Sequence, residues 1–266
     1  MKTPGLLDQM NAHSAERVRA LRSRGPLARL RRQAMGTAPA PALVLSGFDV
    51  LAEVKWRSPS EGALALPRDL GAETALRAIE YAEAGAAAVS VLTEPLRFGG
   101  DLSLLTSAAG ICPVPVMRKD FLVDPIQVYE ARAAGAGGVL LIVRSLSDAL
   151  LADMLGAAAE CGLFVLIEAF DAADLARLPP LPPGTLVGVN TRDLVTLAVD
   201  PSRLADLVGL IPKSCVPVAE SGMLTPADVG AAGALGYRMA LVGSALMRSA
   251  DPAVLVAQMK EAGRCS

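Results

Sequence analysis

Short apolar runs alternate with longer helix-like stretches along the chain from about residue 48 onward. The runs are apolar at consecutive positions rather than at alternate ones, which is typical of parallel strands covered by helices. They span residues 50–54, 87–92, 114–117, 139–143, 164–167, 186–189, 216–219 and 239–242. Because the intervals between runs leave room for a helix and two loops, the pattern predicts eight βα units.

Signals for the ends and starts of helices repeat with the same period. A glycine that closes a helix in the left-handed conformation is expected at Gly85, Gly135, Gly162 and Gly236. A capping side chain followed by proline predicts helix starts at Asp124, Asp200, Thr225 and Asp251. Eight such units predict an α/β fold, a single (β/α)8 TIM barrel. An open doubly wound sheet is the alternative, although no G-x-G-x-x-G follows the first run.

The segment before the first apolar run is expected to be a helical extension of the barrel. Residues 14–21 have the pattern of an amphipathic helix, and residues 37–41 read as a linker. The segment is too short to bury a core of its own. We therefore expect residues 1–47 to cap the barrel and residues 48–266 to form the catalytic domain.

Composition and charge exclude several classes of protein. The 266 residues are 52% hydrophobic and 20% charged with a net charge of −2, which argues against disorder and a nucleic-acid partner. Aromatic residues make up 3%, too few for base-stacking surfaces. No apolar stretch reaches about 18 residues and the N-terminal segment lacks a signal-peptide core, so no membrane partner is expected.

Cysteine and histidine limit the chemistry. The four cysteines are widely scattered and form no C-x-x-C pair, which fits buried thiols in a reducing cytoplasm. The single histidine, His13, lies in the N-terminal extension. Histidine acid–base chemistry and most transition-metal sites are therefore excluded from the barrel, and no metal or organic cofactor is expected. In an enzyme of this composition, Lys, Glu and Asp would move the protons.

Charged residues gather at the predicted strand ends, where a barrel builds its active site. Two of the five lysines, Lys55 and Lys119, end strands, and lysine can release a proton once its surroundings lower its pKa. Glu53, Glu168 and Glu220 lie at the ends of three strands and could pair with them. Such a cluster shifts pKa values apart, as acid–base catalysis requires. Solvated surface charges are the alternative for each residue alone.

Small residues after the last two strands suggest a phosphate site. Ser221 and Gly222 follow the seventh run, and Gly243 and Ser244 follow the eighth. Barrels often bind phosphate on these two loops, where backbone N–H groups are exposed. Ordinary turn glycines are the alternative for either loop alone.

With these residues in view, the chain resembles indole-3-glycerol phosphate synthase, an enzyme of tryptophan biosynthesis. The resemblance runs through nearly the whole barrel. It rests on residues 52–55, 58–60, 90–94, 98–100, 118–121, 129–136, 188–194, 220–222 and 243–247. The segments around Lys119 and Asn190 are the most specific to that family.

The resemblance implies a decarboxylating and dehydrating ring closure of 1-(2-carboxyphenylamino)-1-deoxyribulose 5-phosphate. It implies that Lys119 is the general acid that protonates the ribulosyl carbonyl oxygen. Lys55 would bind the substrate carboxylate and act as the acid in the dehydration, and Glu168 would be the general base. Supporting roles are implied for Glu53, Glu220 and Asn190. The partner is a phosphorylated small molecule, and the expected assembly is a monomer or weak homodimer.

The same resemblance implies residues that hold the substrate. The phosphate cradle would consist of Ser58, Ser221, Gly222, Gly243 and Ser244. The slot for the aryl ring would be lined by Phe98, Phe121 and Leu194. Arg192 would support the anthranilate side of the substrate.

Three departures from the family pattern stand out. Trp56 and Arg57 replace small or basic residues after the first lysine, Glu61 replaces a lysine in the following loop, and Ala169 and Phe170 follow Glu168. A paralogue that acts on a substituted anthranilate is therefore an alternative. Two others are an enzyme in which Lys119 forms a Schiff base and a barrel that serves as an interaction module.

Overall fold

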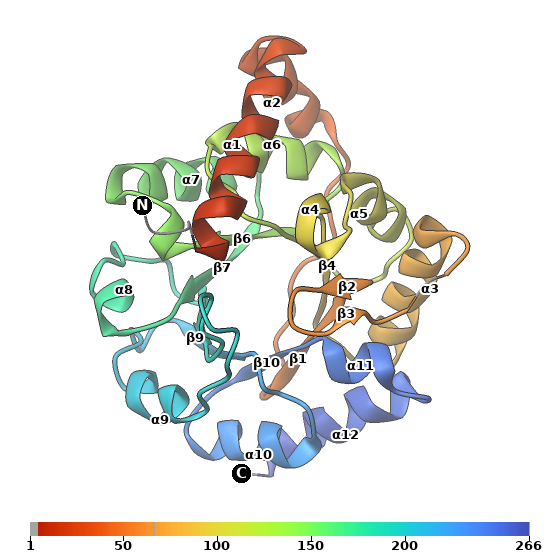
Figure 1. The fold of residues 1–266 in the computed structure, drawn as a ribbon, viewed down its shortest axis with the longest axis vertical. Helices are drawn as coiled ribbons and strands as arrows, with labels where there is room; N and C mark the ends of the chain where they lie inside the picture. The colour runs from red at the N-terminus through yellow and green to blue at the C-terminus, as the bar shows by residue number, and fades with distance from the viewer. Residues whose placement is uncertain (1–4, 66, 266) are drawn as a thin grey trace.

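Eight parallel strands close into a barrel in the computed structural model, which describes residues 5–65 and 67–265 (Figure 1). In chain order they are β1 (Asp49–Val54), β4 (Ala88–Leu92), β5 (Val116–Lys119), β6 (Gly138–Ile142), β7 (Phe164–Ala169), β8 (Leu186–Asn190), β9 (Val216–Glu220) and β10 (Met239–Val242). Strand β1 pairs with both β4 and β10, so the sheet has no edge. The prediction of a (β/α)8 barrel is confirmed, and the open doubly wound sheet is wrong.

Helices surround the barrel, as Figure 1 shows. The longer ones are α3 (Leu70–Glu83), α5 (Leu102–Ala109), α6 (Pro125–Ala133), α7 (Asp148–Glu160), α9 (Ser202–Val208), α10 (Pro226–Ala234) and α12 (Pro252–Arg264). Shorter elements after the strand ends are α4 (Pro95–Phe98), η1 (Val143–Ser145), α8 (Ala172–Ala176), α11 (Ser244–Arg248) and the hairpin of β2 (Arg57–Ser58) and β3 (Gly62–Ala63). No helix among the described residues is both long enough and apolar enough to span a membrane.

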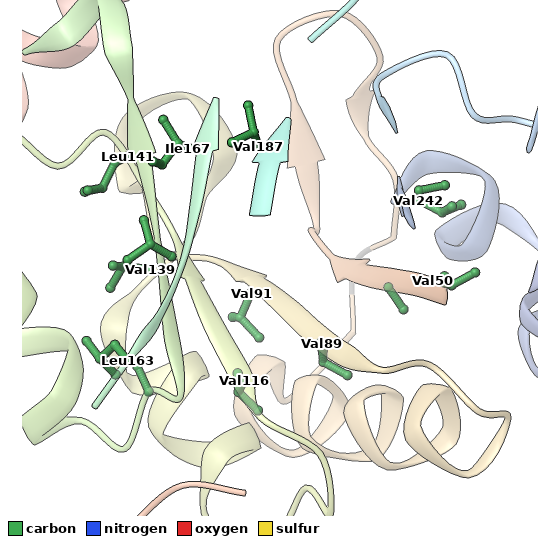
Figure 2. Packing of buried hydrophobic residues seen from close by; sticks show 14 of the residues in the cluster. Val50, Val89, Val91, Val116, Val139, Leu141, Leu163, Ile167, Val187 and Val242 are labelled. Atoms are coloured by element: carbon green, nitrogen blue, oxygen red, sulfur yellow. The ribbon is translucent and has the colours of Figure 1, made fainter. Parts of the chain in front are cut away.

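The two faces of each strand bury different clusters, because successive side chains point to opposite faces. Side chains such as Val50, Val89 and Val187 pack outward beneath the helices (Figure 2). Leu51 and Met117 belong to a second cluster inside the barrel. This alternation carries the last inward position of each strand to the mouth of the barrel. These positions are Glu53, Leu92, Lys119, Ile142, Glu168, Asn190, Glu220 and Leu241.

The predicted helix signals are found with one change. Gly85, Gly135, Gly162 and Gly236 all have positive φ after a helix. The side chains of Asp124, Thr225 and Asp251 cap α6, α10 and α12. Helix α9 instead begins at Ser202 with Pro201 as its N-cap. The helix therefore begins one position later than expected. The Asp200 carboxylate still accepts a hydrogen bond from the Ser202 N–H at 3.1 Å.

Two helices precede the barrel. The predicted helix 14–21 lies within α1 (Leu6–Ser23), and α2 (Leu27–Gly36) packs against α6 (Figure 1). Helix α1 is anchored to the loop after β5, since Arg17 makes two hydrogen bonds of 2.7 Å with Asp120. Arg22 pairs with Asp124 in the same loop at 2.8 Å. The division at residue 47 into an extension and a catalytic domain stays a prediction.

Candidate active site

A cavity opens where the carboxyl ends of the strands meet. Of the predicted site residues, only Ser58 is absent from its lining. The predicted residues that line it are Glu53, Lys55, Phe98, Lys119, Phe121, Glu168, Asn190, Arg192, Leu194, Glu220, Ser221, Gly222, Gly243 and Ser244. Residues from most of the barrel strands and the loops that follow them thus converge on a single space.

Lys119 lies at the centre of a group of carboxylates. Its Nζ is 3.4 Å from Glu168 Oε2 and 3.5 Å from Glu220 Oε2. Burial alone would lower the pKa of Lys119, but the negative charges of Glu168, Glu220 and Glu53 outweigh burial and raise it. The expectation that the surroundings lower the pKa of this lysine is therefore wrong. The site holds Lys119 as an ammonium ion, which can donate a proton.

Glu220 is the most unusual acid of this group. Neither of its carboxyl oxygens has a hydrogen-bond partner among the described residues, and the residue is 1% exposed. Burial, followed by the negative charge of Glu168, raises the pKa of Glu220 well above its ordinary value, while the charge of Lys119 opposes this shift. Glu220 therefore holds a proton more readily than an ordinary carboxylate does.

The carboxyl group of Glu220 fits only because residue 188 on the neighbouring strand is glycine. A Cβ atom at Gly188 would overlap Glu220 Oε1. We expect Gly188→Ala to push Glu220 away from Lys119 and to lower kcat about 100-fold, because small displacements of catalytic groups are costly.

Steady-state kinetics of Gly188→Ala beside Gly156→Ala tests this role. Gly156 lies in α7, where a Cβ would meet nothing within 4 Å, so this control should keep parental kcat. A Gly188→Ala variant with parental kcat would show that the observed position of Glu220 is not needed.

Lys55 and Glu53 form a second ion pair at the mouth. Lys55 Nζ lies 2.7 Å from Glu53 Oε1, and the two side chains are 15% and 3% exposed. Gly243 approaches this pair so closely that a Cβ there would overlap Glu53 Oε1 and lie 2.9 Å from Lys55 Nζ. The pair is thus held between β1 and the loop after β10.

Asn190 is fixed by two hydrogen bonds to its carbonyl oxygen. Asn190 Oδ1 accepts from the Arg192 N–H at 2.9 Å and from Ser221 Oγ at 2.8 Å. Its amide NH₂ is left as the group that can donate into the cavity. Ser221 has a φ of 65°, which is costly for a residue with a side chain and is common at functional sites.

Apolar side chains line one part of the cavity. The rings of Phe98 and Phe121 have centroids 6.2 Å apart with their planes inclined by 39°. Leu194 packs against the same cluster. Arg192 Nη1 donates to the Leu197 carbonyl at 3.0 Å, which holds its side chain beside this region.

Ser58 lies in the β2–β3 hairpin beside the cavity. Its Oγ accepts a hydrogen bond from the Glu61 N–H at 3.1 Å and lies 3.3 Å from Glu61 Oε2. The hydroxyl is therefore engaged within the turn. A role of Ser58 in phosphate binding stays a prediction.

A buried network that sequence reasoning missed holds the strand end of Lys119. Asp120 is 1% exposed and accepts hydrogen bonds from Arg17, Arg118, Thr93 Oγ1 and the Phe121 N–H. Burial alone would raise the pKa of Asp120, but these partners lower it far below its ordinary value. The only signal in the sequence was an acid directly after Lys119.

Among the described residues, no group of three His, Cys, Asp or Glu side chains is placed to hold a metal ion.

Comparison with known proteins identifies the family. The model of the family "indole-3-glycerol phosphate synthase" matches residues 7–259. The indole-3-glycerol phosphate synthase of Paenarthrobacter aurescens (strain TC1) is 39% identical over 267 residues, covering 97% of this chain and 96% of that protein. The chain belongs to the indole-3-glycerol phosphate synthase family. The enzyme of that name from Nocardioides sp. (strain ATCC BAA-499 / JS614) is 45% identical over 221 residues, covering 83% of each chain.

Family membership settles the reaction class. The protein has indole-3-glycerol phosphate synthase activity and is a carboxy-lyase of tryptophan biosynthesis that acts on a phosphorylated small molecule.

Solved structures support the fold alone. A 3-hexulose-6-phosphate synthase from Salmonella typhimurium superimposes with a TM-score of 0.61 at 16% identity, covering 81% of this chain and 98% of that one.

Two of the three departures from the pattern of indole-3-glycerol phosphate synthases lie outside the cavity. Trp56 is buried, and its Nε1 donates to Thr74 Oγ1 at 2.9 Å. Phe170 is 1% exposed beneath the guanidinium of Arg144, which lies 4.7 Å from the ring centroid. These residues serve packing. The third departure, Glu61, reaches a residue of the cavity.

Proposed function

We propose that the cavity closes the indole ring of 1-(2-carboxyphenylamino)-1-deoxyribulose 5-phosphate and that Lys119 supplies the proton for the first step. The observation that carries this assignment is the position of Lys119 Nζ between Glu168 and Glu220, with its pKa raised. A lysine held as an ammonium ion carries the proton that a general acid has to donate, and it is no nucleophile until it loses that proton.

The first step joins the aryl carbon that bears the carboxylate to the ribulosyl carbonyl carbon. As this bond forms, the π electrons of the carbonyl move to its oxygen, and Lys119 protonates that oxygen. Carbon dioxide then leaves, and the electrons of the broken bond restore the aromatic ring. The new hydroxyl finally leaves as water, with a proton lost from the adjacent carbon, which completes the indole.

Glu168 is the general base of the dehydration in this proposal. Its carboxylate is 3% exposed, which strengthens its interactions with charged groups. Because Glu168 Oε2 is 3.4 Å from Lys119 Nζ, the proton that Glu168 accepts can return to Lys119 between turnovers. Glu220, with its raised pKa, lies 3.5 Å from Lys119 Nζ and helps to orient it.

Lys55 binds the substrate carboxylate and protonates the leaving hydroxyl. Glu53 holds the Lys55 ammonium at 2.7 Å and thereby fixes its position. Asn190 donates its amide N–H to a substrate hydroxyl. Phe98, Phe121 and Leu194 enclose the aryl ring, and Arg192 supports the anthranilate side.

The phosphate end of the substrate occupies the part of the cavity beside β9 and β10. Ser221, Gly222, Gly243 and Ser244 line the cavity there and carry small side chains or none. The hydroxyl of Ser244 already donates to an anionic oxygen, that of Glu61. This supports a preference for anions at this position.

We further propose a cytoplasmic monomer or weak homodimer that needs no nucleic acid or membrane. Residues 1–47 would cap the catalytic barrel of residues 48–266. All four cysteines are free thiols, which suits a reducing compartment.

The proposed function is tested with the synthetic substrate. We expect indoleglycerol phosphate to appear as an increase in indole fluorescence, with one carbon dioxide released for each product. Consumption of the substrate without an indole product, or no turnover at all, would contradict the assignment.

The competing Schiff-base mechanism is tested by reduction. We expect borohydride, added during turnover, to leave the mass of the protein unchanged, because Lys119 acts as a proton donor. Intact-protein mass spectrometry provides the readout. A mass increase equal to reduced substrate, located on Lys119, would overturn the acid assignment in favour of covalent catalysis.

A further inference from the structure

The β2–β3 hairpin places a carboxylate against the residue that follows β10 and Gly243. Ser244 Oγ donates a hydrogen bond to Glu61 Oε2. The guanidinium of Arg248 in the same helix, α11, lies 3.0 Å from Glu61 Oε1. Figure 1 shows the hairpin beside α11 at the barrel mouth. Two anion-binding groups next to the cavity are thus engaged by an anion of the protein itself.

Ser244 and Arg248, the two partners of Glu61 outside its own hairpin, differ in their surroundings. Ser244 is buried and lines the cavity, whereas the side chain of Arg248 is 58% exposed. An exposed ion pair with Arg248 alone would be an ordinary surface contact of little consequence. The hydrogen bond to Ser244 is different, because the substrate phosphate needs the same hydroxyl in the orientation proposed above.

We propose that the carboxylate of Glu61 occupies part of the phosphate subsite and competes with the phosphate of the substrate. The inference rests on the proposed function, since it places the substrate phosphate at Gly243 and Ser244. A carboxylate and a phosphate dianion cannot share one hydroxyl donor without strong repulsion. Glu61 therefore moves away when the substrate binds, and the substrate binds more weakly than it would without this carboxylate.

Glu61 remains charged in the free protein. Burial alone would raise its pKa, but the Ser244 hydrogen bond and the charges of Arg248 and Lys55 lower it. The competitor is therefore an anion at neutral pH, as the phosphate is.

The hairpin is built so that Glu61 can move. Each of its strands has two residues, and Gly62 and Ala63 are exposed. Gly62 has a φ of 70°, and a Cβ there would meet nothing within 4 Å. A hairpin with strands of two residues has few backbone contacts of its own to break when it opens.

The test measures the binding of inorganic phosphate by calorimetry and its inhibition constant against substrate. Glu61→Gln removes the charge and keeps the shape, and Glu61→Lys replaces the competitor with a cation. Glu160→Gln is the matched control, because Glu160 also pairs with an arginine, Arg31, but lies at the end of α7 away from the cavity.

We expect Glu61→Gln to tighten phosphate binding on the order of tenfold and to lower the KM of the substrate, with a larger effect in Glu61→Lys. Glu160→Gln should bind phosphate as the parent protein does. Unchanged phosphate binding in both Glu61 variants would overturn the inference, as would equal tightening in Glu160→Gln. Calorimetry does not depend on turnover, so a failure of the proposed function would appear separately, as loss of substrate conversion by the parent protein.

Discussion

Lys119→Met is expected to lower kcat by about 10²–10⁴-fold, the usual contribution of a general acid in a step that develops charge. Methionine nearly matches the length of lysine but has no ionisable proton to donate. Lys119 Nζ lies 3.4 Å from Glu168 Oε2 and 3.5 Å from Glu220 Oε2, and the raised pKa keeps the lysine protonated. The loss should appear in kcat measured by indole fluorescence, because the proton is transferred only in the transition state.

The fold of Lys119→Met should survive. Glu220, whose pKa is already raised, can take up a proton when the neighbouring ammonium is removed. Glu168 and Glu220 are then not left as two adjacent negative charges without a cation. Lys213→Met is the control, since Lys213 is exposed in the segment before β9. Circular dichroism and thermal unfolding should be alike in the two variants. A Lys119→Met enzyme within a few-fold of parental kcat would exclude Lys119 as the acid.

Glu168→Gln is expected to lower kcat by a similar factor, about 10²–10⁴-fold, while KM changes little. The amide keeps the shape of the carboxylate and can still accept a hydrogen bond from Lys119, but it cannot take up a proton at neutral pH. Dehydration would then lack its base. Steady-state kinetics with the synthetic substrate separates the two constants.

The outcome for Glu168→Gln distinguishes a base from a positioning residue. Glu83→Gln, in the exposed part of α3, makes the same chemical change away from the cavity and should keep parental kinetics. If Glu168→Gln showed normal kcat and a raised KM, Glu168 would serve only to hold the substrate. Loss of kcat with accumulation of a decarboxylated but hydrated intermediate would support the base assignment.

The barrel and its mouth could be predicted because both follow from local patterns. Continuous apolar runs mark parallel strands, and the alternation of side chains along a strand assigns Leu51, Glu53 and Lys55 to one face. Closure then brings strand ends together whatever their separation in the sequence. For this reason the sequence alone predicts that Lys119, Glu168 and Glu220 lie close together.

Other features depend on contacts that no local pattern encodes. Helix α2 was not predicted, since its sequence is rich in arginine and only Ala34 is buried in it. The contact between Arg17 and Asp120 joins residues 103 positions apart. The direction of the pKa shift of Lys119 depends on how many carboxylates surround it in space, and the sequence does not specify that number.

The central claim is that Lys119 acts as an acid. It is tested most directly by replacing the lysine amine with an amine of lower pKa. Lys119→Cys treated with bromoethylamine acquires an aminoethyl thioether, which has nearly the length of lysine and a lower pKa. We expect recovery of indoleglycerol phosphate formation, with the alkaline limb of the pH profile of kcat moved to lower pH. The parent protein treated in the same way controls for reaction at Cys265, which is exposed. Recovery with an unshifted alkaline limb, or equal recovery with an uncharged alkyl group of the same length, would contradict the claim.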